Sequence, residues 1–273
     1  MAYKRILSIQ DISCVGQCSM TVAMPILSAC GHETCILPTA VLSTHTGGFG
    51  KPVIRHLDDA LVSMAEHWIS QEIRFDAILV GYLGKVDTIR AVGAIVRRLL
   101  SPGGMLIVDP AMADHGKLYA GFDQEYVREM TQLCLEADIM LPNLTEAAMM
   151  ADLPCPDAQD SSAIAQLLSQ LGGRDVVLTG VSTAPGNTGA AVRESGTVSF
   201  CCHERVERSF HGTGDMFAAC FTGALMQDWS AVSAAQLAGE FTLRAIRETI
   251  AAPAHWYGVK FEPVLPWLSS RFQ

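Results

Sequence analysis

Short apolar segments alternate with longer helical patterns along most of this chain, and this alternation restricts the possible folds more than any other feature. The apolar segments resemble strands buried on both faces of a parallel sheet, and they cover residues 6–9, 35–37, 77–80, 106–108, 139–141 and 176–179. The helical patterns between them cover residues 20–30, 57–70, 88–100, 126–136 and 161–171. Because parallel strands need crossover helices, the order predicts an α/β fold with a mostly parallel central sheet and helices on both faces.

The pattern changes after Gly189. Residues 190–193 and 198–202 form two strand-like runs around a short polar turn, which predicts a small antiparallel edge. Two helices are expected next, over residues 214–226 and 231–250, and the second has one apolar face that should pack on the sheet. Since no repeat or linker interrupts the chain, we expect a single domain over residues 1–273.

Composition excludes several classes of protein. With 273 residues, 49% of them apolar, the chain can bury a large core. The formal net charge of −9 argues against nucleic acid and anionic membranes as partners. Charged residues make up only 17%, against about 25% in an average soluble domain, and we interpret this deficit as surface covered in a homo-oligomer.

The cysteines and the amino terminus indicate a cytoplasmic protein. Nine cysteines are scattered without a Cys-x-x-Cys pair, so we expect reduced thiols rather than a disulfide framework or a structural zinc site. The first ten residues contain only a short apolar run, too short for a signal peptide or a membrane span.

The segment Gly212, Thr213, Gly214 and Asp215 opens an apolar helix. Two residues without Cβ let backbone amides point into one space, where the positive end of the helix dipole helps to bind an anion. Asp215 could then accept the proton of an attacking hydroxyl while the amides hold a transferring phosphoryl group. Alternatively, Asp215 only complements the helix dipole and the glycines form an ordinary turn.

Two polar clusters follow neighbouring predicted strands. Asp109 and Asp114 come after one strand, and Asn143 and Glu146 come after the next and open a helix. Each has a structural interpretation, since Asp109 could cap a turn and the other pair has the spacing of a capping box. Because the carboxyl ends of the strands meet at one edge, where Asp215 also lies, together they favour a Mg²⁺-nucleotide site.

Other catalytic motifs are incomplete. The glycine-rich residues 47–51 lack the upstream glycine of a P-loop, and Pro52 stands where Ser or Thr would bind Mg²⁺. The first strand is not followed by Gly-x-Gly-x-x-Gly, and the chain has no Gly-x-Ser-x-Gly. A dinucleotide-dependent oxidoreductase and a serine hydrolase are therefore disfavoured.

The order of motifs along nearly the whole chain resembles the ribokinase-like superfamily and, within it, the pyridoxal/pyridoxamine (vitamin B6) kinases. The matching segments are residues 8–10 with Gly16, Ser-Thr-His-Thr-Gly at 43–47, Gly-Tyr-Leu-Gly at 81–84, Asp109-Pro110 with Asp114, Pro-Asn-Leu-Thr-Glu at 142–146, and residues 212–215. The resemblance implies ATP-dependent phosphorylation of the 5′-hydroxymethyl group of pyridoxal, pyridoxamine or pyridoxine for pyridoxal 5′-phosphate salvage. It also implies Mg²⁺ and K⁺. We expect the homo-oligomer to be a homodimer.

The same resemblance implies roles for individual residues. Asp215 is similar to the catalytic base, and the amides of Gly212, Thr213 and Gly214 to the anion-binding site. The residues similar to substrate contacts are Thr46, Tyr82 and Tyr119, the last in a segment that covers the substrate. The residues similar to nucleotide contacts are Asn143, Glu146, Thr179 and Thr213, and those similar to metal-binding residues are Asp109, Asp114 and Glu146.

Three residues depart from the vitamin B6 kinase pattern. Asp11 replaces a serine that contacts the ring, so we expect the Asp11 side chain to reach the substrate; Leu141 replaces a threonine beside the nucleotide. His211 precedes the glycines as it does in hydroxymethylpyrimidine kinases, which perform the same chemistry on a thiamine precursor. That activity is one alternative. A non-catalytic vitamin-binding homologue is another, although the intact Gly-Thr-Gly-Asp argues against it.

Overall fold

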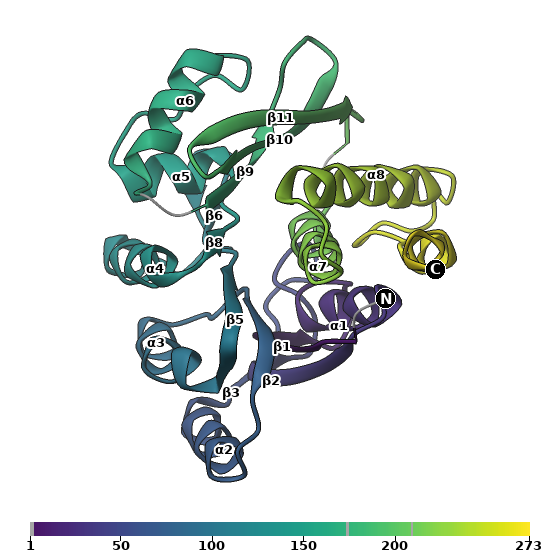
Figure 1. Ribbon diagram of the computed structural model, residues 1–273. Coiled ribbons are helices and arrows are strands. Elements are labelled where there is room, and N and C mark those ends of the chain that lie inside the picture. The colour runs from purple at the N-terminus through teal and green to yellow at the C-terminus, as the bar shows by residue number, and fades with distance from the viewer. Residues whose placement is uncertain (1–2, 173–174, 209) are drawn as a thin grey trace.

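The computed structural model describes residues 3–172, 175–208 and 210–273, and within these ranges the chain forms a nine-stranded sheet between two layers of helices (Figure 1). In spatial order the strands are β11 (Thr197–Glu204), β10 (Asn187–Glu194), β9 (Asp175–Val181), β8 (Ile139–Met140), β5 (Leu100–Val108), β4 (Phe75–Val80), β1 (Arg5–Ser13), β2 (Glu33–Leu42) and β3 (Ile54–His56). The strands from β9 to β2 pair in parallel, and β10 and β11 add antiparallel to β9. The predicted sheet and its antiparallel edge are confirmed.

Two small β features were not predicted, and neither was α9 (Leu265–Ser269) with its flanking 3₁₀ helices. Strand β3 pairs antiparallel with β2 at the other edge, and β6 (Ala113–Asp114) with β7 (Lys117–Leu118) forms a separate two-stranded sheet. All three residues of β3 are exposed. A strand that buries no side chain has no apolar pattern, so the sequence carries no signal for it.

Helices cover both faces of the sheet, as predicted. One layer contains α2 (Asp58–Ser70), α3 (Val86–Leu99), α4 (Gln124–Glu136), α5 (Leu144–Ala151) and α6 (Ser161–Gln170), and the other contains α1 (Met20–Ala29), α7 (Thr213–Leu225), α8 (Ala231–Ile250) and α9 (Leu265–Ser269) (Figure 1). Short 3₁₀ helices, Glu262–Val264 and Ser270–Phe272, flank α9. None of the helices in the described ranges combines the length and apolarity needed to cross a bilayer.

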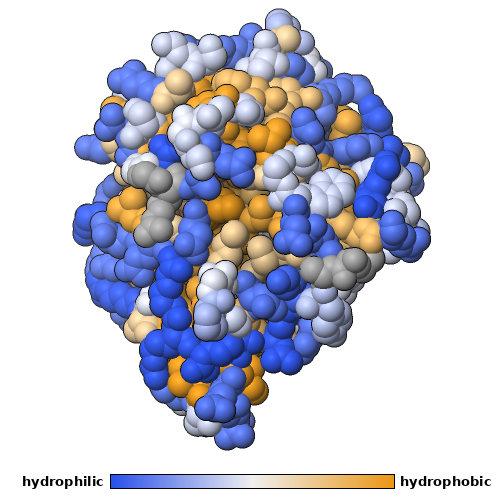
Figure 2. Space-filling model, viewed as in Figure 1, coloured by the Kyte–Doolittle hydropathy of each residue, from blue (hydrophilic) through white to orange (hydrophobic). Residues whose placement is uncertain are grey.

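Successive residues of the central strands face opposite helix layers. In β1, Ile6 belongs to the core with α1, α7 and α8, whereas Leu7 belongs to the core with α2–α6. This alternation follows from the two-residue period of a strand, and burial on both faces explains the continuous apolar runs in the sequence. On the face seen in Figure 2, hydrophilic residues predominate around the rim and hydrophobic residues gather toward the middle.

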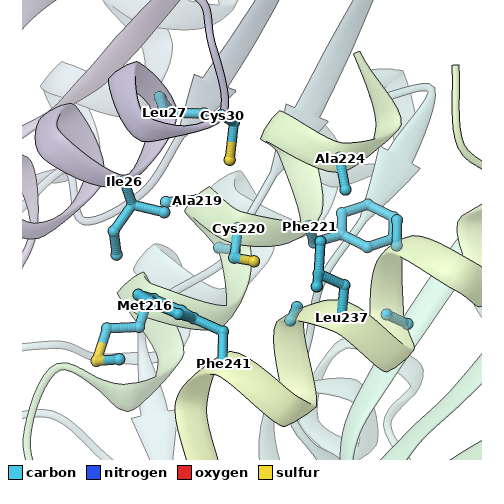
Figure 3. Packing of buried hydrophobic residues seen from close by; sticks show 14 of the residues in the cluster. Ile26, Leu27, Cys30, Met216, Ala219, Cys220, Phe221, Ala224, Leu237 and Phe241 are labelled. Carbon is cyan, nitrogen blue, oxygen red and sulfur yellow. The ribbon is translucent and has the colours of Figure 1, made fainter. Parts of the chain in front are cut away.

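Small residues let α1 and α7 pack closely. Figure 3 shows Ile26, Leu27 and Cys30 of α1 against the side of α7 that carries Ala219 and Cys220, with Leu237 and Phe241 of α8 beyond them. A Cβ added to Gly223 of α7 would lie 2.5 Å from the Cys30 sulfur, so only glycine permits this approach. The packing holds α7 rigidly, which fixes where its first turn meets the carboxyl edge of the sheet.

All nine cysteines lie within the described ranges and are free thiols, as predicted. The prediction about the amino-terminal segment concerns residues 1–10, of which residues 1 and 2 lie outside the described residues.

Candidate active site

The amino end of α7 has the features of an anion-binding site. Gly212 is the N-cap with φ +83°, and a Cβ there would lie 2.2 Å from the carbonyl oxygen of Gln17, so glycine is required. The N-cap offers no side-chain hydrogen bond, and the first helical bond runs from the Met216 amide to the Gly212 carbonyl. The first amides of a helix have no partner within it. Beside them, a Cβ added to Gly214 would meet no heavy atom within 4 Å, so the space is open.

Asp215 lies in the first turn of α7 with its carboxylate held toward the loop after β1. The Ser19 amide donates to Oδ2 of Asp215 at 2.8 Å. Burial raises the pKa of Asp215 to about 6, and the negative charge of Asp11 acts in the same direction, while the Ser19 amide opposes them. A carboxylate with this pKa is mostly ionised at neutral pH yet accepts a proton more readily than an ordinary aspartate, which suits a general base.

Asp11 lies near enough to Asp215 for its charge to act there, but it lies inside β1, which continues to Ser13, rather than after the strand as expected from the sequence. The pairing of β1 with β2 shifts register between Gln10 and Ile12, and this irregularity places Asp11. The carboxylate is only 2% exposed and accepts a hydrogen bond from the Ser13 hydroxyl at 2.9 Å. Burial raises the pKa of Asp11.

Asp109 and Glu146 form a second carboxylate pair where β5 and β8 end. Burial raises the pKa of Glu146 to about 7, and burial together with the charges of Glu146 and Asp215 raises the pKa of Asp109. The capping box is present, because Asn143 Oδ1 accepts from the Glu146 amide at 3.0 Å and Glu146 Oε2 accepts from the Asn143 amide at 2.9 Å. Asp109 Oδ1 accepts from the Ala111 amide at 3.1 Å, as in a turn cap.

The three residues predicted to bind metal do not form one compact ligand set. Asp114 lies on β6, exposed to solvent, and accepts from the amide of its neighbour His115. Within the described residues no three His, Cys, Asp or Glu side chains lie close enough together to hold a metal ion. Burial is the largest cause of the raised pKa of both Asp109 and Glu146, and the charge of Glu146 adds to it at Asp109, so a cation beside them would stabilise both ionised carboxylates. This arrangement fits a hydrated Mg²⁺ better than a directly ligated one.

Stacked aromatic rings surround Tyr82, one of the residues predicted to contact the substrate. Tyr82 stacks on Phe122 at 5.5 Å between ring centroids, and Phe122 stacks on Tyr126 at 3.7 Å. Burial, with a contribution from Asp11, raises the pKa of Tyr82 to about 12, so this ring lies within the electrostatic reach of the Asp11 carboxylate. Tyr119 is 41% exposed, and the partial burial of its ring together with the charges of Glu146 and Asp109 raises its pKa. Tyr82 therefore lies near Asp11, and Tyr119 lies near Asp109 and Glu146.

The remaining predicted residues lie at the same edge of the sheet. Thr179 of β9 donates its amide to the Pro142 carbonyl at 2.9 Å and pairs with Asn143, so it lies beside the start of α5. Thr46 is exposed in the loop after β2, whereas its neighbour His45 is buried. Thr213 is the first residue of α7, and its hydroxyl donates to the Phe210 carbonyl at 3.3 Å.

Sequence reasoning missed the packing around His45. Its Nδ1 accepts from the Gly47 amide at 2.9 Å, its Nε2 has no hydrogen-bond partner in the described part of the chain, and its ring lies 5.0 Å from that of His211. The carboxyl-terminal segment also packs on this loop. The ring of Trp256 lies 4.7 Å, between centroids, from the ring of Phe49, which follows His45 in the loop after β2. His45 belongs to the Ser-Thr-His-Thr-Gly motif, but only the fold reveals that it is buried.

A mostly parallel sheet between two helix layers, with an open helix amino terminus beside a buried carboxylate, is the arrangement of the ribokinase-like small-molecule kinases. The chain belongs to the phosphomethylpyrimidine kinase family, whose model matches residues 25–259. The predicted fold class and the resemblance to vitamin B6 kinases of the ribokinase-like superfamily are confirmed by the relatives that follow.

Three relatives illustrate the similarity. A pyridoxal kinase from Lactobacillus plantarum has 33% sequence identity and a TM-score of 0.91, over 99% of this chain and 98% of that one. A phosphomethylpyrimidine kinase-like protein from Bacteroides thetaiotaomicron, in a crystal form with pyridoxal, has 33% identity and a TM-score of 0.90, over 98% and 96%. A pyridoxine/pyridoxal/pyridoxamine kinase from Bordetella avium is 29% identical over 254 residues, 88% of this chain and 84% of the relative.

Proposed function

We propose that this protein transfers the γ-phosphoryl group of ATP to the 5′-hydroxyl of pyridoxal, pyridoxamine or pyridoxine and so forms the 5′-phosphate. The observation that carries the proposal is the Asp215 carboxylate, with a pKa of about 6, beside the open, glycine-built amino end of α7. The similarity to a pyridoxal kinase and to a pyridoxine/pyridoxal/pyridoxamine kinase supports the choice of a vitamin B6 substrate.

In the proposed reaction Asp215 accepts the proton of the 5′-hydroxyl as its oxygen attacks the γ-phosphorus. The new O–P bond forms while the bond between the γ-phosphorus and the bridging oxygen breaks, and ADP leaves with that electron pair. The amides at the start of α7, from Gly212 to Gly214, stabilise the negative charge on the transferring group.

The other residues divide between the two substrates. For the vitamer we propose contacts from Asp11, Thr46, Tyr82 and Tyr119, and for the nucleotide from Asn143, Glu146, Thr179 and Thr213. Asp109 and Glu146, with the exposed Asp114 further out, would hold Mg²⁺ through its bound water, and the cation would supply positive charge next to the phosphates. We also propose K⁺ as a second cation, and a cytoplasmic homodimer built from a single domain over residues 1–273.

A coupled assay that follows ADP release tests the proposal with pyridoxal, pyridoxamine and hydroxymethylpyrimidine side by side. We expect kcat/KM for a vitamin B6 substrate to exceed that for hydroxymethylpyrimidine at least about tenfold, a ratio that corresponds to about 1.4 kcal/mol. His211 beside the anion-binding site and the phosphomethylpyrimidine kinase family model favour the pyrimidine as the second candidate. The reverse preference would establish that candidate, and binding without turnover would identify a non-catalytic homologue.

Asn143→Ala or Glu146→Ala is expected to raise the Mg²⁺ or MgATP requirement more than the vitamer KM. Both side chains open α5 at the carboxyl edge, where a hydrated Mg²⁺ is held through carboxylates and phosphates. Stability should fall as well, since Glu146 accepts from the amides of Met112, Ala113 and Asn143 and each buried amide left unpaired costs about 1–3 kcal/mol.

Asp160→Ala is the matched control for this prediction. Asp160 caps α6 by accepting from the Ala163 amide at 2.9 Å, so its loss removes a cap that lies at another helix. If the Asn143 and Glu146 variants, like this control, only melt at lower temperature and keep normal metal kinetics, the capping box is their whole role.

Asp11→Ser is expected to raise the KM of a vitamin B6 substrate mainly at low pH, with kcat little changed. An ionised carboxylate only accepts hydrogen bonds, and a protonated pyridine nitrogen would donate a charge-assisted one that weakens as pH rises. The effect should be largest above the raised pKa of Asp11 and below that of the pyridinium, because only there are both groups charged.

KM measured against pH for the wild type and Asp11→Ser decides this point, with Ser13→Ala as the control that removes only the hydroxyl donating to Asp11. Parallel pH curves, or a change confined to thermal stability, would show that Asp11 does not contact the ring.

A further inference from the structure

A small hairpin after β5 is joined to the first turn of α5 by side chains of that turn. We call residues 111–119 the flap; it contains β6, β7 and, at the turn between them, His115 with φ +50° and Gly116 with φ +76°. Two consecutive positive φ values are typical of a type I′ hairpin turn. With only two residue pairs in its ladder, such a hairpin needs outside contacts to hold its position.

Those contacts come from three neighbouring residues. The Thr145 hydroxyl accepts from the Gly116 amide at 3.0 Å, Asn143 Nδ2 donates to the Ala113 carbonyl at 2.8 Å, and Glu146 Oε1 accepts from the Met112 amide at 2.8 Å. Asn143 and Glu146 thus hold the base of the flap, and Thr145 holds its tip. Thr145 is uncharged and 6% exposed, and it has no role in the proposed nucleotide or metal site.

The flap ends at Tyr119, which connects it to the substrate region. The Tyr119 amide donates to the Met112 carbonyl at 2.9 Å and closes the flap on itself. The Tyr119 ring lies 6.5 Å from Phe122, which stacks on Tyr82, and the charges of Glu146, Asp109 and Asp215 contribute to its raised pKa. A displacement of the flap tip would therefore move Tyr119 relative to both the Asp215 carboxylate and the stacked rings of Phe122 and Tyr82.

We infer that Thr145 is a positioning residue, whose hydroxyl bond to the Gly116 amide fixes the flap and thereby sets Tyr119 over the vitamer. The inference rests on the proposed function for the identity of the substrate. The hydrogen bond between Thr145 and Gly116 does not depend on that function. Thr145 acts through the flap, so its removal should weaken vitamer binding without altering the proton transfer to Asp215 or the binding of the nucleotide.

Thr145→Val tests the inference because it keeps the shape of the side chain and removes the hydroxyl, and Thr145→Ser is the control that restores it. Gly116 is exposed, so its released amide can bond to water and the fold should survive. Hydrogen exchange at Gly116, followed by NMR, should become about 3- to 10-fold faster in the valine variant and stay near the wild-type rate in the serine variant, as expected for loss of a single hydrogen bond.

The kinetic expectation is specific to one substrate. In Thr145→Val the vitamer KM should rise about 2- to 10-fold, while kcat and the MgATP KM stay within twofold. Thr145→Ser should match the wild type. In a Tyr119→Ala background, Thr145→Val should have no further effect on the vitamer KM, because the residue through which Thr145 acts is already gone.

The other outcomes are distinguishable. Unchanged exchange at Gly116 would show that the bond does not hold the flap, and faster exchange with an unchanged vitamer KM would show that the flap does not serve the substrate; either overturns the inference. A vitamer KM effect that persists without Tyr119 overturns it as well. A wild-type protein inactive on all vitamers would overturn the proposed function and with it the vitamer assignment, while the exchange rates would still report on the bond. If Thr145→Val is insoluble, Thr145→Ala takes its place in the same measurements.

Discussion

Replacement of Asp215 by asparagine is expected to lower kcat roughly 10²–10⁴-fold and to leave vitamer binding within a few-fold of the wild type, the usual effect of removing a positioned general base. The amide keeps the size of the side chain, and its oxygen can still accept from the Ser19 amide as Asp215 does at 2.8 Å. It cannot accept the proton of the 5′-hydroxyl. Steady-state kinetics with pyridoxal, together with a direct binding measurement, separates the two effects.

The pH dependence supplies an independent test of the same assignment. Because the pKa of Asp215 is about 6, kcat/KM of the wild type should fall tenfold per pH unit below about pH 6. This limb should be absent from the residual activity of the asparagine variant. A limb that persists unchanged in the variant would assign it to another group.

Stability distinguishes the base from a residue that only complements the helix dipole. The folded-state pKa of Asp215 lies above the ordinary 3.8, so folding favours the protonated form; the stability that this group contributes is present at low pH and is lost as pH rises through about 6. At pH 8 we therefore expect Asp215→Asn to melt no lower than the wild type. Asp59→Asn, an exposed aspartate in the first turn of α2, is the matched control with normal turnover. Near-normal turnover with a lower melting temperature in Asp215→Asn would instead support the dipole role.

Gly212→Ala is expected to cost about 2–4 kcal/mol of folding free energy and most of the activity. At φ +83° a side chain costs about 1–2 kcal/mol, and the new Cβ would lie 2.2 Å from the Gln17 carbonyl oxygen, a backbone atom that cannot rotate away. Either α7 or the loop after β1 must then move, and that loop carries the Ser19 amide bonded to Asp215. Thermal unfolding should show a melting temperature lower by roughly 5–15 °C.

Gly214→Ala is the control, two residues away in the same turn. A Cβ at Gly214 meets no heavy atom within 4 Å, so this variant should melt at or above the wild-type temperature, as glycine to alanine in a helix usually does. Its methyl group enters the open space assigned to the phosphoryl group, so kcat should still fall. If both variants are equally stable, the steric argument for Gly212 is wrong.

The aspartates show which parts of the candidate site could be predicted from local sequence. Asp215 could be placed from the sequence, because glycines before an apolar helix specify both the turn and the direction of the helix dipole. Asp11 was expected after the first strand, yet it lies inside β1, because the strand continues past the apolar run and pairs with β2 again at Ile12 and Ser13. Asp114 follows Asp109 closely in sequence, but the β6–β7 turn carries it to the surface.

The sequence by itself determined the layered α/β architecture, the antiparallel edge after Gly189 and the helix start at Gly212, because burial on both faces, helical periodicity and glycine conformation act over a few neighbouring residues. The tertiary structure alone decided the position of β3, the burial of His45 against His211, the packing of Trp256 on Phe49, and the bonds from the Met112 and Ala113 amides to Glu146. Each of these depends on segments far apart in the chain. Their contact energies arise only after the sheet has assembled, so no local pattern encodes them.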